Sequence, residues 1–163
     1  MHLTTTKIPF PTPLLLIGVA TPLVALGVLL FGGTDPTAGA VVGVVGIGAL
    51  VAGLMLPARH WLEITDDEVR LHYRPLLTRR IATGDIVRFE LIERVHPVQY
   101  WGAGLRLASG NVVAFVNRPG PALRIQPARG WSSVIVLASA EEAEAVRRRL
   151  EETTGRTVER RGA

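Results

Sequence analysis

Hydrophobic residues follow three different patterns along this chain, and each pattern predicts a different kind of element. Two almost continuous apolar stretches, residues 14–31 and 38–56, fill most of the first 58 residues, where the only charged side chains are Lys7 and Asp35. At about 1.5 Å per residue, helices of this length are roughly 27 and 28 Å long, close to the thickness of a bilayer's hydrocarbon core. Residues 1–58 are therefore predicted to form a transmembrane helical hairpin.

The segment between the two stretches is short and rich in turn-forming residues. It runs from Gly32 to Thr37 and includes Asp35 and Pro36, so it predicts a tight connection between the spans. A cleaved signal peptide is the alternative for the first stretch, with Gly32, Gly33 and Thr34 as a small-residue cleavage region. Two uncleaved spans are favoured because the first stretch exceeds a typical signal core and a second span follows at once.

After residue 59 the pattern changes to alternation with a period of two. Leu62 and Ile64 alternate with polar neighbours, and Val69, Leu71 and Tyr73 do the same after a turn at residues 66–68. This alternation predicts strands that each bury one face. Further strands are predicted at residues 76–82, 86–92, 104–108, 112–116, 122–126 and 132–137, separated by Gly, Pro, Asn and Asp turns. Seven or eight short strands of this spacing predict an antiparallel barrel or sandwich.

A third pattern, with helical spacing, follows the strands. Ser139 with Glu142 three residues later forms a capping-box signature, and Ala143, Val146 and Leu150 lie on one helical face. A helix is predicted at residues 140–153, ending near Gly155. Residues 156–163 are predicted to be a flexible tail.

The cations indicate an orientation for the hairpin. None lies in the connector, whereas Lys7 precedes the first span and Arg59 is the first of several arginines that follow the second. Because Lys and Arg beside a span resist translocation, both termini are expected in the cytoplasm and Asp35 on the far side of a cell membrane crossed twice.

The net positive charge of the chain is weak evidence for a particular partner. Of the 18 cations 17 are arginines, which together with abundant Ala, Val and Gly indicates a GC-rich coding bias. Six Arg and six Glu balance after residue 139, and the surplus lies in residues 59–139, with 11 Arg against seven acids. A cytoplasmic domain of this charge is attracted to an anionic leaflet. Nucleic acid is not expected as a partner, since no basic helix, zinc-ligand spacing or stacking motif accompanies the charge.

The order of elements in residues 61–152 resembles a pleckstrin-homology-like (PH-like) domain. The resemblance rests on the opening strand pair WLEITDDEVRLHYRPLLTRR, the next hairpin IATGDIVRFELI and the terminal helix SAEEAEAVRRRLEE. With the preceding hairpin, the chain looks like bacterial membrane proteins that carry two helices and such a domain, many of them uncharacterised. The resemblance implies a small antiparallel β-barrel of seven or eight strands with a carboxyl-terminal helix across one opening, spanning residues 59–155. A rival interpretation is another two-helix membrane family with a small β-rich tail.

Residues with catalytic potential are sparse. The histidines His2, His60, His72 and His96 have no metal-site spacing, and there is no cysteine, nucleophile elbow or phosphate loop. His60, beside Trp61 at the end of the second span, is interpreted as an interfacial residue, and His72 as lying on the polar side of a strand. The chain is therefore expected to be no enzyme and to bind no metal or cofactor.

Two groups of residues remain as candidates for binding a lipid or a protein. Arg74, Arg79 and Arg80 surround an early hairpin, in the region where PH-like domains commonly bind phospholipid headgroups; the alternative is a solvated hairpin that obeys the positive-inside bias. Tyr100 and Trp101 lie in a Gly-rich loop, where a Trp can contact a partner, plug a barrel mouth or enter the headgroup zone.

Small residues mark one face of the second span. Gly39, Gly43, Gly46 and Gly53 share this face, and the first two have the GxxxG spacing that lets helix backbones approach closely. Packing within the hairpin is favoured over a dimer interface. No ionisable residue lies inside either span, which disfavours a channel or proton relay.

These patterns predict a membrane-anchored cytoplasmic domain that acts as a non-enzymatic adaptor or accessory subunit of a membrane complex. Its expected partners are the lipid bilayer and another membrane protein. A domain that senses anionic phospholipid is the alternative. The two differ in salt sensitivity, because apolar protein interfaces tolerate salt better than polybasic lipid contacts.

Overall fold

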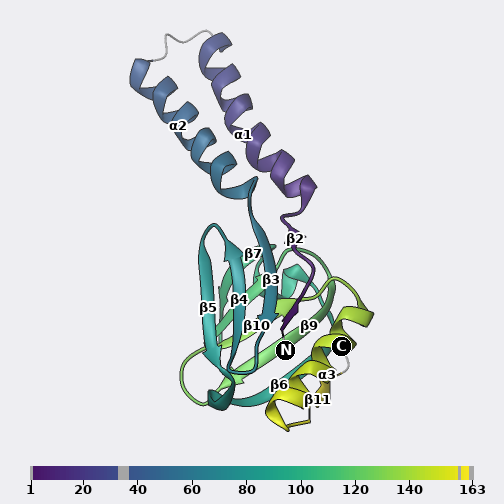
Figure 1. Ribbon diagram of the computed structural model, residues 1–163. Coiled ribbons are helices and arrows are strands. Elements are labelled where there is room, and N and C mark those ends of the chain that lie inside the picture. Colours follow the sequence, from purple (N-terminus) through teal and green to yellow (C-terminus); the bar gives the residue numbers. More distant parts are fainter. Residues whose placement is uncertain (1, 33–36, 158, 162–163) are drawn as a thin grey trace. The chain divides into compact units, whose positions relative to one another are not determined.

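The computed structural model describes residues 2–32, 37–157 and 159–161 (Figure 1). The chain divides into two compact units. One contains residues 10–58, and the other joins the chain up to Pro9 to everything from Arg59 onward. The unit predicted as residues 1–58 therefore lacks its first nine residues, which belong to the β-rich unit.

The helical unit consists of α1 (Thr12–Phe31) and α2 (Ala38–Met55). Both helices are long and apolar enough to cross a membrane. The Thr37 hydroxyl caps α2 by accepting a hydrogen bond from the Ala40 amide at 3.3 Å. The connector position expected on the far side of the membrane, Asp35, lies outside the described residues.

The two helices pack through glycines other than those predicted. A Cβ at Gly48 would lie 3.0 Å from Cβ of Pro22, and one at Gly18 would lie 2.9 Å from Sδ of Met55. A Cβ at any member of the predicted face would meet no atom within 4 Å: Gly39, Gly43, Gly46 and Gly53. The hairpin contact thus uses another face of α2, because the Pro22 ring needs a position without a side chain opposite it.

The first sheet of the β-rich unit is a meander extended by the amino terminus. Strands β3 (Arg59–Ile64), β4 (Glu68–Arg74) and β5 (Leu77–Ala82) pair antiparallel in sequence order. The short strands β1 (Leu3–Thr4) and β2 (Ile8–Pro9) pair antiparallel with the free side of β3. The alternating segments 62–64 and 69–73 form strands as predicted, and we call this layer sheet A.

The second layer, sheet B, is not a meander. Its strand order is β11-β6-β9-β10-β8-β7. The pairs β8/β10 and β6/β11 are parallel, so the prediction of a purely antiparallel barrel is wrong. Neither sheet closes on itself, and the unit is an open β-sandwich. The bounds of these strands are β6 (Ile86–Val95), β7 (Gly104–Ala108), β8 (Val112–Val116), β9 (Gly120–Pro127), β10 (Ser132–Val136) and β11 (Glu159–Arg161).

Apolar side chains fill the space between the sheets. Phe89 and Phe115 are the largest fully buried ones, and Leu62, Leu71 and Ile125 are also inaccessible to solvent. Leu62 and Leu71 come from alternating positions that the period-two pattern identified, whereas every residue of β8 and β10 is buried.

The carboxyl-terminal helix α3 (Ala140–Thr154) ends at Gly155 and buries Ala143, Val146 and Leu150, as predicted. The Ser139 hydroxyl accepts from the Glu142 amide, but the capping box is only half formed. The Glu142 carboxylate instead accepts hydrogen bonds from the amides of Ala138 at 2.7 Å and Thr6 at 2.5 Å. This side chain therefore holds the amino-terminal arm against the start of α3.

Two further hydrogen bonds fix the same arm. The Thr5 hydroxyl accepts from the Leu62 amide at 2.8 Å, and the Asn117 side chain donates to the Ile8 carbonyl at 3.2 Å. Near the other terminus, residues 159–161 form β11, which pairs with β6, and Arg88 forms an ion pair with Glu159. The prediction of a flexible tail from residue 156 is wrong for residues 159–161.

Candidate functional site

The outer face of sheet A carries an aromatic pair that the strand register creates. Trp61 in β3 lies opposite His72 in β4, and their rings stack at a centroid distance of 4.5 Å. Lys7 and Arg74 lie over the indole at 5.2 and 5.8 Å from its centroid. These neighbours leave Trp61 only 7% exposed. Its ring is therefore packed against the sheet and has a structural role there.

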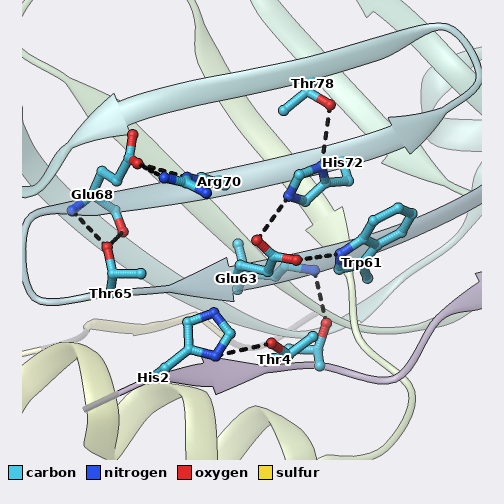
Figure 2. A network of polar contacts seen from close by, with 11 residues as sticks. His2, Thr4, Trp61, Glu63, Thr65, Glu68, Arg70, His72 and Thr78 are labelled. Carbon is cyan, nitrogen blue, oxygen red and sulfur yellow. Dashed lines mark hydrogen bonds and ion pairs between the residues drawn. The ribbon is translucent and has the colours of Figure 1, made fainter.

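A chain of polar groups continues from this pair (Figure 2). Glu63 accepts the indole N–H of Trp61 at 3.0 Å, and its second oxygen lies 3.1 Å from Nε2 of His72. Nδ1 of His72 lies 3.1 Å from the hydroxyl of Thr78. Burial raises the pKa of the Glu63 carboxyl, but the hydrogen bonds from Trp61 and His72 outweigh it and hold the pKa below its ordinary value.

Glu63, His72 and Thr78 follow one another in the order carboxylate, imidazole, hydroxyl, which is also the order in the catalytic triad of many hydrolases. Whether Thr78 could act as a nucleophile depends on the donors around it. A nucleophile needs N–H donors that converge on the developing oxyanion. Thr78 lies inside β5, where backbone N–H groups are spaced along the strand and point alternately to either side. The sheet geometry around Thr78 therefore favours a rigid structural network of Trp61, Glu63, His72 and Thr78.

His60 is buried, which corrects its interpretation as an interfacial residue. Its side chain is fully inaccessible, and Nε2 donates to the Val136 carbonyl of sheet B at 2.9 Å. Burial is the main reason why its pKa falls to about 4. His60 is therefore a neutral residue between the two sheets at pH 7.

The structure does not bring Arg74, Arg79 and Arg80 together as one surface. Arg74 ends β4 and pairs in register with Arg59, whereas Arg80 pairs with Arg70, four residues away along β4. At about 3.3 Å per residue, this separates Arg74 from Arg80 by roughly 13 Å along the strand direction. Arg79 faces the other side of the sheet, donates to the Trp131 carbonyl, and has its pKa lowered by burial.

Arg79 and Arg80 instead line a cleft of about 530 Å³ at the edge of sheet A. Among the described residues, its lining also includes the basic Arg129 and one acidic residue, Asp85. The remaining lining residues are Ile81, Ala82, Pro127 and Ala128. Sequence reasoning missed this cleft because it joins β5 to the segment after β9, about 50 residues further along the chain.

The predicted aromatic pair is split between core and solvent. The short helix η2 (Pro97–Tyr100) begins with a capping box, in which His96 accepts from the Val98 amide and Gln99 accepts from the His96 amide. Tyr100 is partly buried and packs against the apolar cluster that includes Ile8 and Val116. Trp101 adopts a left-handed φ of 64° and is 86% exposed, so it does not plug the interior of the sandwich.

Within the described residues, no group of three His, Cys, Asp or Glu side chains is placed to hold a metal ion. A scan of protein-family models finds none that matches the chain, and a search of curated proteins finds no significant match either.

Proposed function

We propose that this protein is a membrane-anchored, non-enzymatic adaptor or accessory subunit of a membrane complex, with its β-rich unit in the cytoplasm. The observation that carries the proposal is the presentation of Trp101. Its indole is 86% exposed at the end of a short helix that a capping box and the packed Tyr100 both hold in place. A large aromatic side chain on a rigid support is typical of an interface anchor, because little conformational entropy is lost on binding.

The helical unit supports the anchoring role. Neither α1 nor α2 contains an ionisable residue, so the pair lacks the groups that ion pathways and proton relays require. The positive-inside bias supports a topology with both termini in the cytoplasm. Reporter fusions at position 35 and at the carboxyl end should then report opposite compartments; the same compartment for both would contradict the two-span topology.

The alternative function is recognition of anionic phospholipid. The separation of Arg74 from Arg80, and the use of Arg79 to bind a backbone carbonyl, weaken the idea of one polybasic site. Arg74 and Lys7 are already engaged with the Trp61 ring. The resemblance to PH-like membrane proteins agrees with an anchor followed by a β-rich domain, and we include it in the proposal without assigning their lipid site to this chain.

Capture of the partner from native membranes tests the adaptor role. The full chain is solubilised in mild detergent and its co-purifying proteins are quantified for the parent, for Trp101→Ala and for Val87→Ala. Val87 is a matched control because it is an exposed apolar residue of the same unit, on β6. An interface anchor contributes 2 kcal/mol or more, so Trp101→Ala should weaken capture at least about 30-fold.

Two results would contradict this proposal. One is equal capture by the parent and by Trp101→Ala. The other is tight binding of the protein to anionic vesicles at physiological salt that is abolished by changing Arg74, Arg79 and Arg80 together to Ser, because three cations near a surface contribute up to about 3 kcal/mol. That second result would support the lipid alternative.

A further inference from the structure

Strand β5 leaves one side of sheet A open. The sheet order ends at β5, and among the described residues β4 is its one strand neighbour (Figure 1). In an antiparallel strand every second residue directs its N–H and C=O groups away from its partner. A strand at this position therefore presents backbone hydrogen-bonding groups that can pair with another extended segment.

The basic cleft lies along this open side. Four consecutive residues of β5, from Arg79 to Ala82, line it on one side, and Pro127 to Arg129 line it on the other. Four residues in extended conformation cover roughly 13 Å, so a volume of about 530 Å³ is sufficient for a short extended peptide. Because the cleft is at the sheet edge, side chains from both faces of β5 reach it.

The charges around the cleft favour an acidic occupant. Three arginines and one aspartate line it, and the side chains of Arg80 and Arg129 are exposed. Arg79 donates to the Trp131 carbonyl, which fixes the guanidinium while leaving other N–H donors of its fork available. Carboxylates suit such donors because planar guanidinium groups can bind them with two hydrogen bonds.

We propose that the β5 edge and its basic cleft bind an extended acidic segment of a partner protein, which adds to sheet A as a further strand. This inference rests on the proposed adaptor function and names the chemistry of the partner. Backbone pairing with β5 provides affinity, and the arginines select acidic side chains. The same cations disfavour pairing with apolar or basic strands, which protects an exposed sheet edge from aggregation.

Synthetic peptides test this directly on the purified full chain in neutral detergent. The probe is a fluorescent peptide of about eight residues with alternating Glu and Val, and its binding is followed by anisotropy. Two peptide controls are a basic one with Lys in place of Glu, and the acidic one with Pro at alternate Val positions, which removes backbone N–H donors. The acidic peptide should bind, and both controls should bind at least about tenfold more weakly.

Protein variants identify the site. Changing Arg80→Glu together with Arg129→Glu should weaken binding of the acidic peptide about tenfold or more, because two attractions become repulsions. Arg148→Glu is the matched control, since Arg148 is exposed on α3 outside the cleft, and it should change affinity less than about twofold. Amide hydrogen exchange of residues 79–82 should slow when the acidic peptide binds the parent protein.

Several outcomes would overturn the inference. Equal binding of the acidic and Pro-containing peptides would show an anion site without strand addition. Loss of self-association in the Arg80→Glu/Arg129→Glu variant, without peptide binding to the parent, would show that a second copy occupies the cleft. Anionic vesicles that bind through these two arginines while the peptide does not would show a lipid site. Peptide affinity is tested at Arg80 and Arg129 and membrane capture at Trp101, in separate assays, so failure of this inference and failure of the proposed function are distinct results.

Discussion

Two segments of the β-rich unit place a tryptophan near a histidine, and the fold uses them in opposite ways. In β3, Trp61 follows His60 and is 7% exposed; after η2, Trp101 follows Tyr100 in the turn that His96 caps and is 86% exposed. Trp61 has the ring of His72 stacked on it and cations over it, whereas Trp101 extends from the end of a short helix.

Strand register, more than residue type, therefore decides whether an aromatic side chain supports the fold or remains free to bind. Each residue of a central strand has a cross-strand neighbour, and at position 61 that neighbour is a flat ring. Trp101 follows η2 outside any strand, and it is exposed to solvent. A left-handed φ at Trp101 then turns its side chain away from the core that Tyr100 enters.

Substitution of Trp61 is expected to reduce the stability of the fold most. Trp61→Ala should lower the free energy of unfolding by about 3–5 kcal/mol, the usual cost of removing a large buried aromatic side chain. Trp61→Phe is the matched control: it keeps a ring for His72 but loses the N–H donated to Glu63, and should cost less. Denaturant unfolding of the full chain in detergent, followed by circular dichroism, measures both. A cost below about 1 kcal/mol for the alanine variant would contradict the structural role of Trp61.

The second prediction concerns His60, the buried residue that precedes Trp61 in β3. Its pKa is about 4 in the folded state against an ordinary value of 6.5, so between these values the unfolded chain binds a proton that the folded chain does not. Stability should therefore be complete above pH 6.5 and fall by up to roughly 3 kcal/mol as the pH drops toward 4. His60→Gln keeps an N–H donor for the Val136 carbonyl and should flatten this dependence. An unchanged pH profile in that variant would show that other groups cause it.

A third prediction tests the polar link between the two strands. Glu63→Gln removes the charge that accepts from Trp61 and faces His72, and should cost about 1–2 kcal/mol at neutral pH. Because the pKa of Glu63 is lowered in the folded state, its stabilisation is present above the ordinary carboxyl pKa and is lost as the pH falls through the lowered value. The difference between variant and parent should therefore shrink in acid. A constant difference would indicate that packing, and not charge, is what the substitution changes.

Local pattern predicted most elements of this fold. The predicted segments 104–108 and 112–116 coincide with β7 and β8, and the predicted helix 140–153 differs from α3 by one residue. These elements follow from side-chain periodicity and from capping residues such as Ser139, which act within a few positions of the chain.

Long-range pairing was not predictable in the same way. The parallel contact of β8 with β10, the pairing of β6 with β9 across about 30 residues, and the addition of the amino-terminal arm to β3 leave no periodic signal. The same limit explains the candidate sites. Of the predicted arginine group, Arg79 and Arg80 both line the cleft, whereas Arg74 lies four residues along β4 from the position that pairs with Arg80. The Trp61–His72 stack could have been predicted from the sequence, because the turn at Asp66 and Asp67 sets the register of β3 and β4.

The smallest effect is expected at Trp101, and it completes the comparison. Trp101→Ala should change the free energy of unfolding by less than about 0.5 kcal/mol, because an exposed side chain leaves little apolar surface to lose. Tyr100→Ala is the matched control: its ring packs on the core, so it should cost more, about 1–2 kcal/mol. Both are measured by the same denaturant unfolding of the full chain. A large cost at Trp101 would mean that its ring supports the fold after all, and any loss of partner capture by Trp101→Ala would then reflect unfolding. A small cost, together with lost capture, assigns the residue to binding, because the side chain would matter to the complex and not to the folded chain alone.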